Sequence, residues 1–535
     1  MRTFFSSCFL VLFITTSQAQ SALVERVLED ASPIGYGLKT NHSIPDANGG
    51  LYLVGSEGDA RGLILRTDSN GMPMWSMHYT GGAFPNIFPD INFASVIQLP
   101  DKDLVLSGIM VDTALNALCA LIMRCDSSGA VRWARKLDTP GFYSRFNSIT
   151  ACTDGGFLCT GGIETNQLQA SRLLVCKTDS VGLFEWCMAY DGLNHVNVGR
   201  DAAELSDGSF LVTGFSENLS PFDGTVSLMH INSSGAVLKA KRIRSTNSTY
   251  CAGSALHVEG STCTVFVYQS DGVSMLRGDT SLSTWAAYPF QIGSFSGGLA
   301  PTYYPGFRMV KDGADGFLFS TQHAFGGSVF RADTSGAVQW GRDVMMQVTD
   351  AHRLPDGRLV FAGAGPLIGV LAPPDRTMGF QPEIGLVFTD SAALAGTCIV
   401  PWLPAPTPFV QFQFDSVNIN SSPIGALSAV AVQAASQSIS NRLGCVSITG
   451  GLTENTHGLS VTVHPNPAND RFEVRVSDSG KMLMEVFRTD GKRVFASEFG
   501  DGRHTIFTNT WCSGIYLVRC RSGNRNTTIR VAVMH

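Results

Sequence analysis

Short apolar runs separated by turn residues recur along most of the chain. In a run such as 157–161 (FLCTG), apolar residues are mixed with small or polar ones over the length of one strand. The runs are bounded by two kinds of turn, which return in phase at intervals of about 53 residues. Short apolar runs between turn residues are typical of β-strands. The pattern therefore predicts an all-β chain built from a repeated unit.

The first turn places Asp and Gly before an apolar strand, as in Asp154-Gly155-Gly156, with copies at 48–55, 101–108, 207–214, 259–266, 315–320 and 356–363. The second turn has Asp, Gly three residues later and Trp four residues after the Gly. It occurs at 68–75, 126–133, 179–186 and 333–340, with weaker copies at 232–239, 279–285 and 390–396. Asp can bond its own backbone two residues on, and Gly can adopt a positive φ. The Trp can then wedge between neighbouring sheets, where we expect it to be buried.

Together the two turns divide each unit into four short strands, and the unit occurs seven times. A period of 40 to 50 residues with four strands is typical of propeller blades. We therefore predict a seven-bladed β-propeller over residues 22–396. The seventh unit has no good Trp strand, so the N-terminal segment Val24–Leu28 is expected to complete the last blade and remove the open sheet edges.

The innermost strands are compared by counting back six residues from each first-turn Asp or its equivalent. This column contains Thr40, Ser95, Ser148, Asp201, Gly253 and Asp350, with Gly306 as a looser match, and all are small or acidic. We expect the column to line a narrow axial channel, either for packing reasons alone or as a ligand site. His42 and His352 share one repeat position four residues before the turn. They are a metal or acid–base candidate, although spacing fixes no carboxylate partner. The candidate ligand-binding residues are thus His42, Ser95, Ser148, Asp201, Asp350 and His352.

Residues 1–19 have the features of a secretory signal peptide. Arg2 forms a minimal positive region, 8–14 is apolar, and Ser17 and Ala19 suit a cleavage site. No later segment is long enough for a membrane helix. A net charge of −6 and a pI near 6.0 give no electrostatic reason to expect nucleic acid as a partner. These features predict a secreted protein without a transmembrane segment.

Cysteine spacing suggests disulfides in an exported chain. The pairs Cys152/Cys159, Cys176/Cys187 and Cys251/Cys263 each straddle a predicted hairpin turn, and cross-strand bridges or buried thiols are both open for them. Residues 397–452 form a predicted β extension and linker, with Cys398 and Cys445 as its staple. No cysteine pair has zinc-finger spacing with matching His residues, and Asp312, Asp315 and Gly316 lack the full calcium ladder, so no metal is expected.

Residues 459–535 resemble the C-terminal sorting domain of the type IX secretion system of Bacteroidetes. The resemblance is carried by 461–467 (VTVHPNP), Asp490-Gly491-Lys492, 514–518 (GIYLV) and the final strand 527–533; Arg530 stands where members commonly have Lys. It implies a small Ig-like β-sandwich, recognition by the type IX secretion machinery, and delivery to the cell surface or medium through the signal peptide and type IX export. It also implies removal of the domain, and we expect the cut near residues 449–458.

The propeller repeats also resemble those of bacterial secreted quinoprotein-like propellers, but their turn spacing differs by one residue. The resemblance therefore implies neither a quinone cofactor nor sugar hydrolysis for this chain. The chain contains no nucleophile elbow, metalloprotease helix motif or phosphate loop. We therefore expect no cofactor and a binding module that offers its propeller face to a glycan or protein ligand. A secreted hydrolase or lyase acting on polysaccharide or peptide, with its site at the axial channel, is the alternative.

Overall fold

The computed structural model describes two compact units separately, residues 1–446 (unit 1) and 447–535 (unit 2). In unit 1 it describes residues 25–30, 38–57, 61–81, 90–112, 117–165, 171–191, 196–219, 222–246, 250–269, 272–290, 307–323, 326–344, 346–364, 384–393, 399–402, 412–424, 426–429, 431–436 and 439–443. In unit 2 it describes 461–464, 468–476, 482–488, 492–500, 502–511, 514–522 and 525–533. The predicted signal peptide, Val24, Gly306, Cys398, Cys445 and the 449–458 linker lie outside these ranges.

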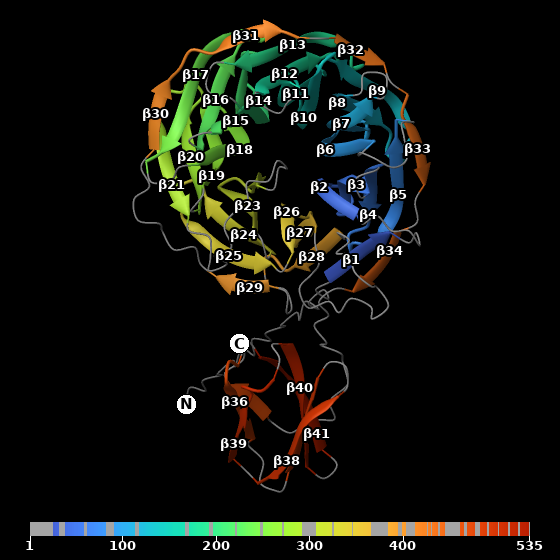
Figure 1. Cartoon of the computed structure of the whole chain (residues 1–535), viewed down its shortest axis with the longest axis vertical. Helices are drawn as coiled ribbons and strands as arrows, with labels where there is room; N and C mark the ends of the chain where they lie inside the picture. The colour runs from blue at the N-terminus through green and yellow to red at the C-terminus, as the bar shows by residue number, and fades with distance from the viewer. Residues whose placement is uncertain are drawn as a thin grey trace, which may run out of the picture. The chain divides into compact units, whose positions relative to one another are not determined.

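The described part of unit 1 consists of β-strands that form seven antiparallel sheets, which stand around a ring (Figure 1). The three or four innermost strands of each sheet follow one another in the chain, and consecutive ones pair antiparallel. We number the sheets in chain order and name the strand nearest the ring axis first. The all-β prediction is confirmed, and the sheets follow the seven predicted repeat units.

Sheet 1 contains β2 (Leu38–Pro45), β3 (Leu51–Glu57), β4 (Arg61–Thr67) and β5 (Pro73–Thr80). Sheet 2 contains β6 (Ile91–Gln98), β7 (Leu104–Asp112), β8 (Ala117–Cys125) and β9 (Val131–Asp138). Sheet 3 contains β10 (Phe142–Ala151), β11 (Phe157–Thr165), β12 (Ser171–Thr178) and β13 (Phe184–Asp191). Sheet 4 contains β14 (Val196–Glu204), β15 (Phe210–Leu219), β16 (Phe222–Ile231) and β17 (Val237–Ser245).

Sheet 5 contains β18 (Cys251–Glu259), β19 (Thr262–Gln269), β20 (Gly272–Asp279) and β21 (Trp285–Phe290). Sheet 6 contains β22 (Arg308–Asp312), β23 (Gly316–His323), β24 (Gly326–Asp333) and β25 (Val338–Val344). Sheet 7 contains β26 (Gln347–Arg353), β27 (Leu359–Ala364), β28 (Ile384–Thr389) and the N-terminal strand β1 (Glu25–Asp30). β1 pairs antiparallel with β28, so the first described strand of the chain completes the last sheet.

Apolar clusters lie between neighbouring sheets. The cluster between sheets 2 and 3, for example, joins Val105 and Ile122 to Phe157 and Leu174, all of which are buried. Similar clusters join sheets 3 and 4 and sheets 7 and 1. Burying both faces of each sheet in this way explains why strands such as β3 are buried along their whole length.

The second turn motif ties each sheet to the next. In sheet 3, Asp179 Oδ1 accepts the backbone N–H groups of Val181 and Leu183 at 3.0 and 2.7 Å, and Gly182 has a φ of 74°. A Cβ built on Gly182 would lie 2.6 Å from the Trp133 ring of sheet 2. The motif therefore needs Gly for two reasons: its positive φ, and the space that the Trp of the preceding sheet occupies. The Trp residues are packed between sheets as predicted, but they are half-buried rather than buried.

Six short strands after sheet 7 run along the outer edges of the ring (orange in Figure 1). They are β29 (Ile399–Trp402), β30 (Phe412–Ser416), β31 (Asn420–Pro423), β32 (Ala426–Ala429), β33 (Gln433–Ser436) and β34 (Ile439–Leu443). In that order they pair with sheets 6, 4, 3, 2, 1 and 7. The predicted extension thus adds one outer strand to each of six sheets and, within its described residues, forms no sheet of its own. We call these six strands the belt.

Cys176 and Cys187 form a disulfide between β12 and β13, so for this pair the bridge is the alternative that holds. For the other two pairs the alternative of buried thiols holds, because Cys152, Cys159, Cys251 and Cys263 are buried and free. The sheet register explains this outcome. Cys159 faces Ile149 on β10 and Cys176 on β12, while Cys263 faces Val258 and Cys251 faces Gln269.

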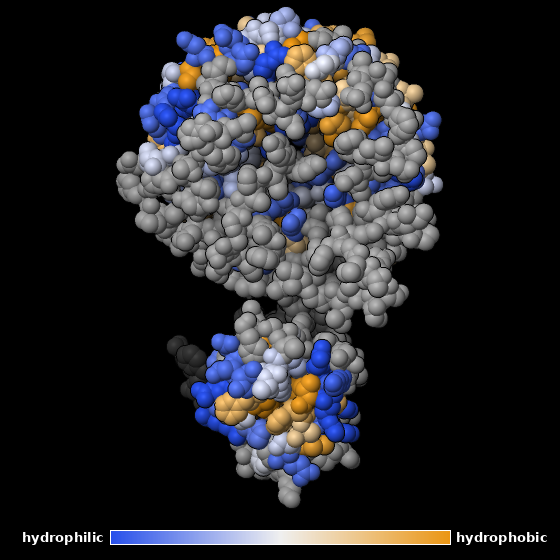
Figure 2. All heavy atoms as spheres, in the orientation of Figure 1, coloured by the Kyte–Doolittle hydropathy of each residue, from blue (hydrophilic) through white to orange (hydrophobic). Residues whose placement is uncertain are grey.

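Unit 2 contains two antiparallel sheets. One consists of β35 (Val461–His464), β36 (Arg471–Val476) and β39 (Gly502–Phe507), and the other of β38 (Arg493–Phe499), β37 (Met482–Arg488), β40 (Gly514–Ser522) and β41 (Arg525–Val533). Phe472, Val486, Val518 and Val531 belong to its buried core. Figure 2 shows apolar residues gathered on the visible face of this unit, between hydrophilic ones. No helix of the described chain is long and apolar enough to cross a membrane.

Candidate functional site

One residue of each innermost strand shares the same place in the sheet. In β2, β6, β10, β14, β18 and β26 the register shifts by one residue at a β-bulge, and the residue after the bulge is His42, Ser95, Ser148, Asp201, Ala255 or Asp350. Arg308 on β22 pairs with the residue 12 positions later, Ser320, as Ser95 pairs with Ser107. We call these seven residues the axial column. Thr40 and Gly253, which spacing placed in the column, instead precede the bulge.

Three side chains of the axial column bond the backbone of the next sheet. Asp350 Oδ2 accepts the Ser43 N–H at 2.6 Å, and Asp201 Oδ2 accepts the Leu256 N–H at 2.8 Å. His42 Nδ1 accepts the Val96 N–H at 3.0 Å. Each donor directly follows the column residue of its own sheet, so one bond is repeated at three junctions. These side chains therefore hold neighbouring innermost strands together.

The two histidines do not form the predicted facing pair. His42 occupies the column, but His352 lies two residues beyond the column residue of its strand, so the turn spacing misaligned them. His352 Nε2 lies 3.1 Å from Ser43 Oγ, and His42 Nδ1 lies 3.2 Å from Ser95 Oγ. Burial lowers the pKa of both imidazoles. Both are therefore neutral hydrogen-bonding groups at pH 7.

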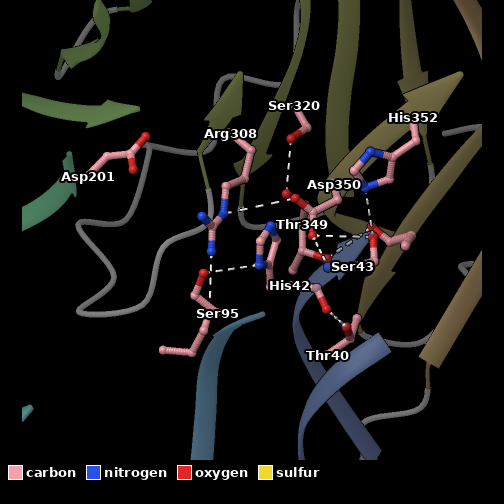
Figure 3. A network of polar contacts seen from close by, with 12 residues as sticks. Thr40, His42, Ser43, Ser95, Asp201, Arg308, Ser320, Thr349, Asp350 and His352 are labelled. Carbon is pink, nitrogen blue, oxygen red and sulfur yellow. Dashed lines mark hydrogen bonds and ion pairs between the residues drawn. The ribbon is translucent and has the colours of Figure 1, made fainter. Parts of the chain in front are cut away.

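Arg308 reaches from sheet 6 to sheet 2 across the axis (Figure 3). Its Nη2 donates to Ala94 O at 3.2 Å, while its Nε lies 3.9 Å from Asp350 Oδ1, too far for a hydrogen bond. Arg308 is only 9% exposed, and neither its Nε nor Asp350 Oδ1 has a hydrogen-bond partner. A buried guanidinium group with unused N–H groups is costly unless something binds them.

Sequence reasoning missed Arg308, because the first turn of sheet 6, like that of sheet 5, is shorter than the first turns of the other five sheets, so counting back from the turn pointed to Gly306. Counting back 12 residues from the paired position on the second strand, as from Ser107 to Ser95, would have identified Arg308 from Ser320.

Ser148 and Asp201 differ in exposure. Ser148 is buried, and its Oγ lies 2.6 Å from Thr160 Oγ1, so it is a core hydroxyl. Asp201 is half-buried, and burial raises its pKa from 3.8 to about 6. The folded protein therefore holds the Asp201 proton more tightly than the unfolded chain does.

The raised pKa of Asp201 predicts a pH-dependent stability. This contribution is fully present below pH 3.8 and is lost as the pH rises through about 6. Asp201→Asn keeps an oxygen for the Leu256 N–H and removes the charge, so we expect the variant to gain about 2 kcal/mol over wild type between pH 4 and pH 8. Urea unfolding at both pH values measures this gain. Asp207→Asn is the control, because hydrogen bonds from Ser209 lower the pKa of Asp207. A gain for Asp201→Asn that does not change with pH would contradict the assignment.

A pocket of about 160 Å³ opens beside the axial column, between the inner strands of sheets 1, 2 and 3. Its lining is partly apolar and partly polar: Ala94, Gly108, Ile109, Leu118 and Phe146, together with Asn41, Asn92, Tyr143, Ser144, Arg145, Asn147 and Glu164. Ile109 and Leu118 are half-buried, so apolar surface is open inside the pocket. An apolar cavity of about 150 Å³ can hold a benzene ring, so this pocket suits one side chain or one ring.

Amide groups from three consecutive sheets border the pocket. Asn41 Nδ2 donates to Asn92 Oδ1 at 2.7 Å and to Phe93 O at 2.8 Å, and Asn147 Nδ2 donates to Gly199 O at 2.8 Å. These bonds leave Asn41 Oδ1 and Asn147 Oδ1 as acceptors and Asn92 Nδ2 as a donor. Asn41 and Asn147 are the bulge residues of their strands. Sequence reasoning did not identify these two residues, although both repeats carry Asn at the same position in the sequence.

The described residues contain no group of three or more His, Cys, Asp or Glu side chains placed to hold a metal ion. Most polar groups of the axial column are bonded to neighbouring strands, although Arg308 Nε and Asp350 Oδ1 are not. Ser43, between Asp350 and His352, is fully buried. The arrangement can therefore bind through the pocket and through Arg308, while Ser43 cannot reach a substrate.

Residues 462–534 match the family described as a secretion system C-terminal sorting domain. The chain is similar to the solved structure of PorZ, an essential bacterial surface component of the type-IX secretion system of Porphyromonas gingivalis, with 10% identity, a TM-score of 0.29 and coverage of 93% of this chain and 99% of that chain. It is also similar to prolyl oligopeptidase B from Galerina marginata, with 10% identity, a TM-score of 0.37 and coverage of 83% and 55%. No curated protein matches it. The export route is assigned from the match to the sorting domain alone. The chain is therefore a type IX secretion cargo that carries a C-terminal sorting domain and is exported to the cell surface or secreted.

Proposed function

We propose that unit 1 is a peptide-binding module whose pocket beside the axial column takes one apolar side chain of an extracellular polypeptide. The observation that carries this proposal is the pocket's composition: half-buried Ile109 and Leu118 lie inside it, and amides border it. Pockets with an apolar lining and a few placed polar groups are typical ligand sites. The free oxygens of Asn41 and Asn147 can accept backbone N–H groups of a bound peptide.

The bonds and burial of the axial column favour binding over catalysis. Asp350, Asp201 and His42 each accept a backbone N–H from the neighbouring sheet, and these bonds hold the ring together. A general acid or base needs a free atom that the substrate can reach, and the one carboxylate oxygen of these residues without a partner, Asp350 Oδ1, is fully buried. The proposed module is a rigid ring that presents one pocket, delivered to the surface by the sorting domain of unit 2.

The test uses a dye-labelled pentapeptide with a central leucine and uncharged ends, and a second peptide with serine in its place. We expect fluorescence anisotropy to show binding of the leucine peptide, and at least about tenfold weaker binding of the serine peptide, because an apolar side chain contributes about 1.5–3 kcal/mol when buried. Leu118→Glu places a charge inside the pocket and should abolish binding of the leucine peptide.

Leu183→Glu is the matched control, because Leu183 is 55% exposed in the second turn of sheet 3. This variant should bind the leucine peptide as wild type does. Equal affinities for the leucine and serine peptides, or unchanged binding by Leu118→Glu, would refute the proposed pocket.

A further inference from the structure

The N–H groups of Arg308 point to a ligand that the axial column itself does not supply. Guanidinium has five N–H groups, and Arg308 uses one of them, from Nη2 to Ala94 O, in a hydrogen bond to the described residues. Its buried Nε has no hydrogen-bond partner. Planar guanidinium groups match carboxylates, which can accept two parallel N–H bonds.

Arg308 is linked to the pocket through one lining residue. Ala94, whose carbonyl oxygen accepts the Arg308 Nη2–H, is also a lining residue of the pocket. A ligand that fills the pocket can therefore place its end at the guanidinium group. His42 lies beside Arg308 in Figure 3, and because its Nδ1 accepts the Val96 N–H, its neutral ring carries the proton on Nε2. Arg308 thus bonds the lining residue Ala94, and His42 directly follows the lining residue Asn41 in the chain.

Other cations lie near the same place. Arg145 lines the pocket, and Arg200 is the bulge residue of β14. Burial, together with the charges of Arg145 and Arg308, lowers the pKa of Arg200 to about 10. The nearest carboxylate to Arg308, Asp350, uses Oδ2 for the Ser43 N–H, and its own burial raises its pKa. Arg308, a buried cation whose Nε has no hydrogen-bond partner, therefore favours an anionic ligand.

We propose that the module captures the C-terminal end of a polypeptide, with the terminal carboxylate on Arg308 and His42 and the last side chain in the pocket. This inference rests on the proposed peptide-binding function and adds the requirement for a free C-terminus. The pocket's volume of about 160 Å³ fits one terminal side chain. Arg308 is the group that favours a terminal carboxylate, because its Nε has no hydrogen-bond partner and can donate to one.

The test compares two dye-labelled peptides that both end in leucine, one as the free acid and one as the C-terminal amide. We expect full-length protein to bind the acid about 10- to 100-fold more tightly, the ratio that charge-assisted hydrogen bonds give. Arg308→Gln keeps a polar side chain of similar length but removes the charge, so the two peptides should bind this variant equally. Its affinity for the amide should equal that of wild type, which also shows that the variant is folded.

Arg132→Gln is the matched control. It removes the same charge from a side chain that is 54% exposed on β9, and it should retain the preference for the acid. If wild type binds acid and amide equally, or if Arg308→Gln keeps the preference, terminal capture is wrong while the peptide-binding function stands. If neither leucine peptide binds, both proposals fail.

Discussion

A chain that ends at residue 524 is expected to stop short of the cell surface. The deletion removes β41, which pairs with β40 from Gly514↔Val533 to Ser522↔Arg525. It also removes the buried side chains of Val531 and Val533 from the core of unit 2. A small domain is typically stable by only about 5–15 kcal/mol, and losing two core side chains together with all hydrogen bonds of one strand exceeds that. Unit 2 is therefore expected to unfold. Because the matched sorting domain spans 462–534, the truncated chain should lose its export signal.

Cell fractionation and immunoblotting in a type IX-competent host measure this effect. Wild type should appear at the surface or in the medium, and the truncated chain in the periplasm, because the predicted signal peptide at residues 1–19 is unchanged. Phe507→Ala is a suitable control, because Phe507 is 61% exposed and lies outside the buried core. Surface delivery of the truncated chain would show that the export information does not require β41.

The sequence predicted the ring's repeated turns because their cause is local. Asp179 and Gly182 fix the second turn of sheet 3 through bonds and angles within five residues. The belt could not be predicted in the same way. β33 (Gln433–Ser436) is exposed along its whole length, so no apolar alternation marks it as a strand. Its pairing is set by the free edge of β5 instead.

The candidate site was predictable only in part. Ser95 and Asp350 were placed in the axial column correctly, because their turns have the regular length. Arg308 was missed because its turn is shorter, and His352 was misaligned with His42. The pocket depends on how the inner strands of three sheets pack, and residues such as Leu118 and Asn147 meet there only after the ring forms. The spacing of residues within one repeat does not show which residues of different sheets contact one another.

Gly182→Ala is expected to destabilise unit 1 by about 2–5 kcal/mol. Its φ of 74° costs a residue with a Cβ about 1–2 kcal/mol. The new methyl group would also lie 2.6 Å from the Trp133 ring, and such overpacking typically costs a further 1–3 kcal/mol. Gly155→Ala, in the first turn of the same sheet, is the matched control. Gly155 has a φ of 83°, but a Cβ there would come no closer than 3.8 Å to a neighbour, so only the backbone cost of about 1 kcal/mol remains.

A double-mutant cycle separates the two costs of Gly182→Ala. In a Trp133→Ala background the ring is absent, so the substitution at Gly182 should cost no more than Gly155→Ala does. The free energies come from urea unfolding of the four variants and wild type. If Gly182→Ala costs the same with and without the Trp133 ring, the space beneath the ring is not what requires Gly. The motif would then be explained by its backbone angle alone, and the Trp contact would not be the reason that Gly recurs in successive sheets.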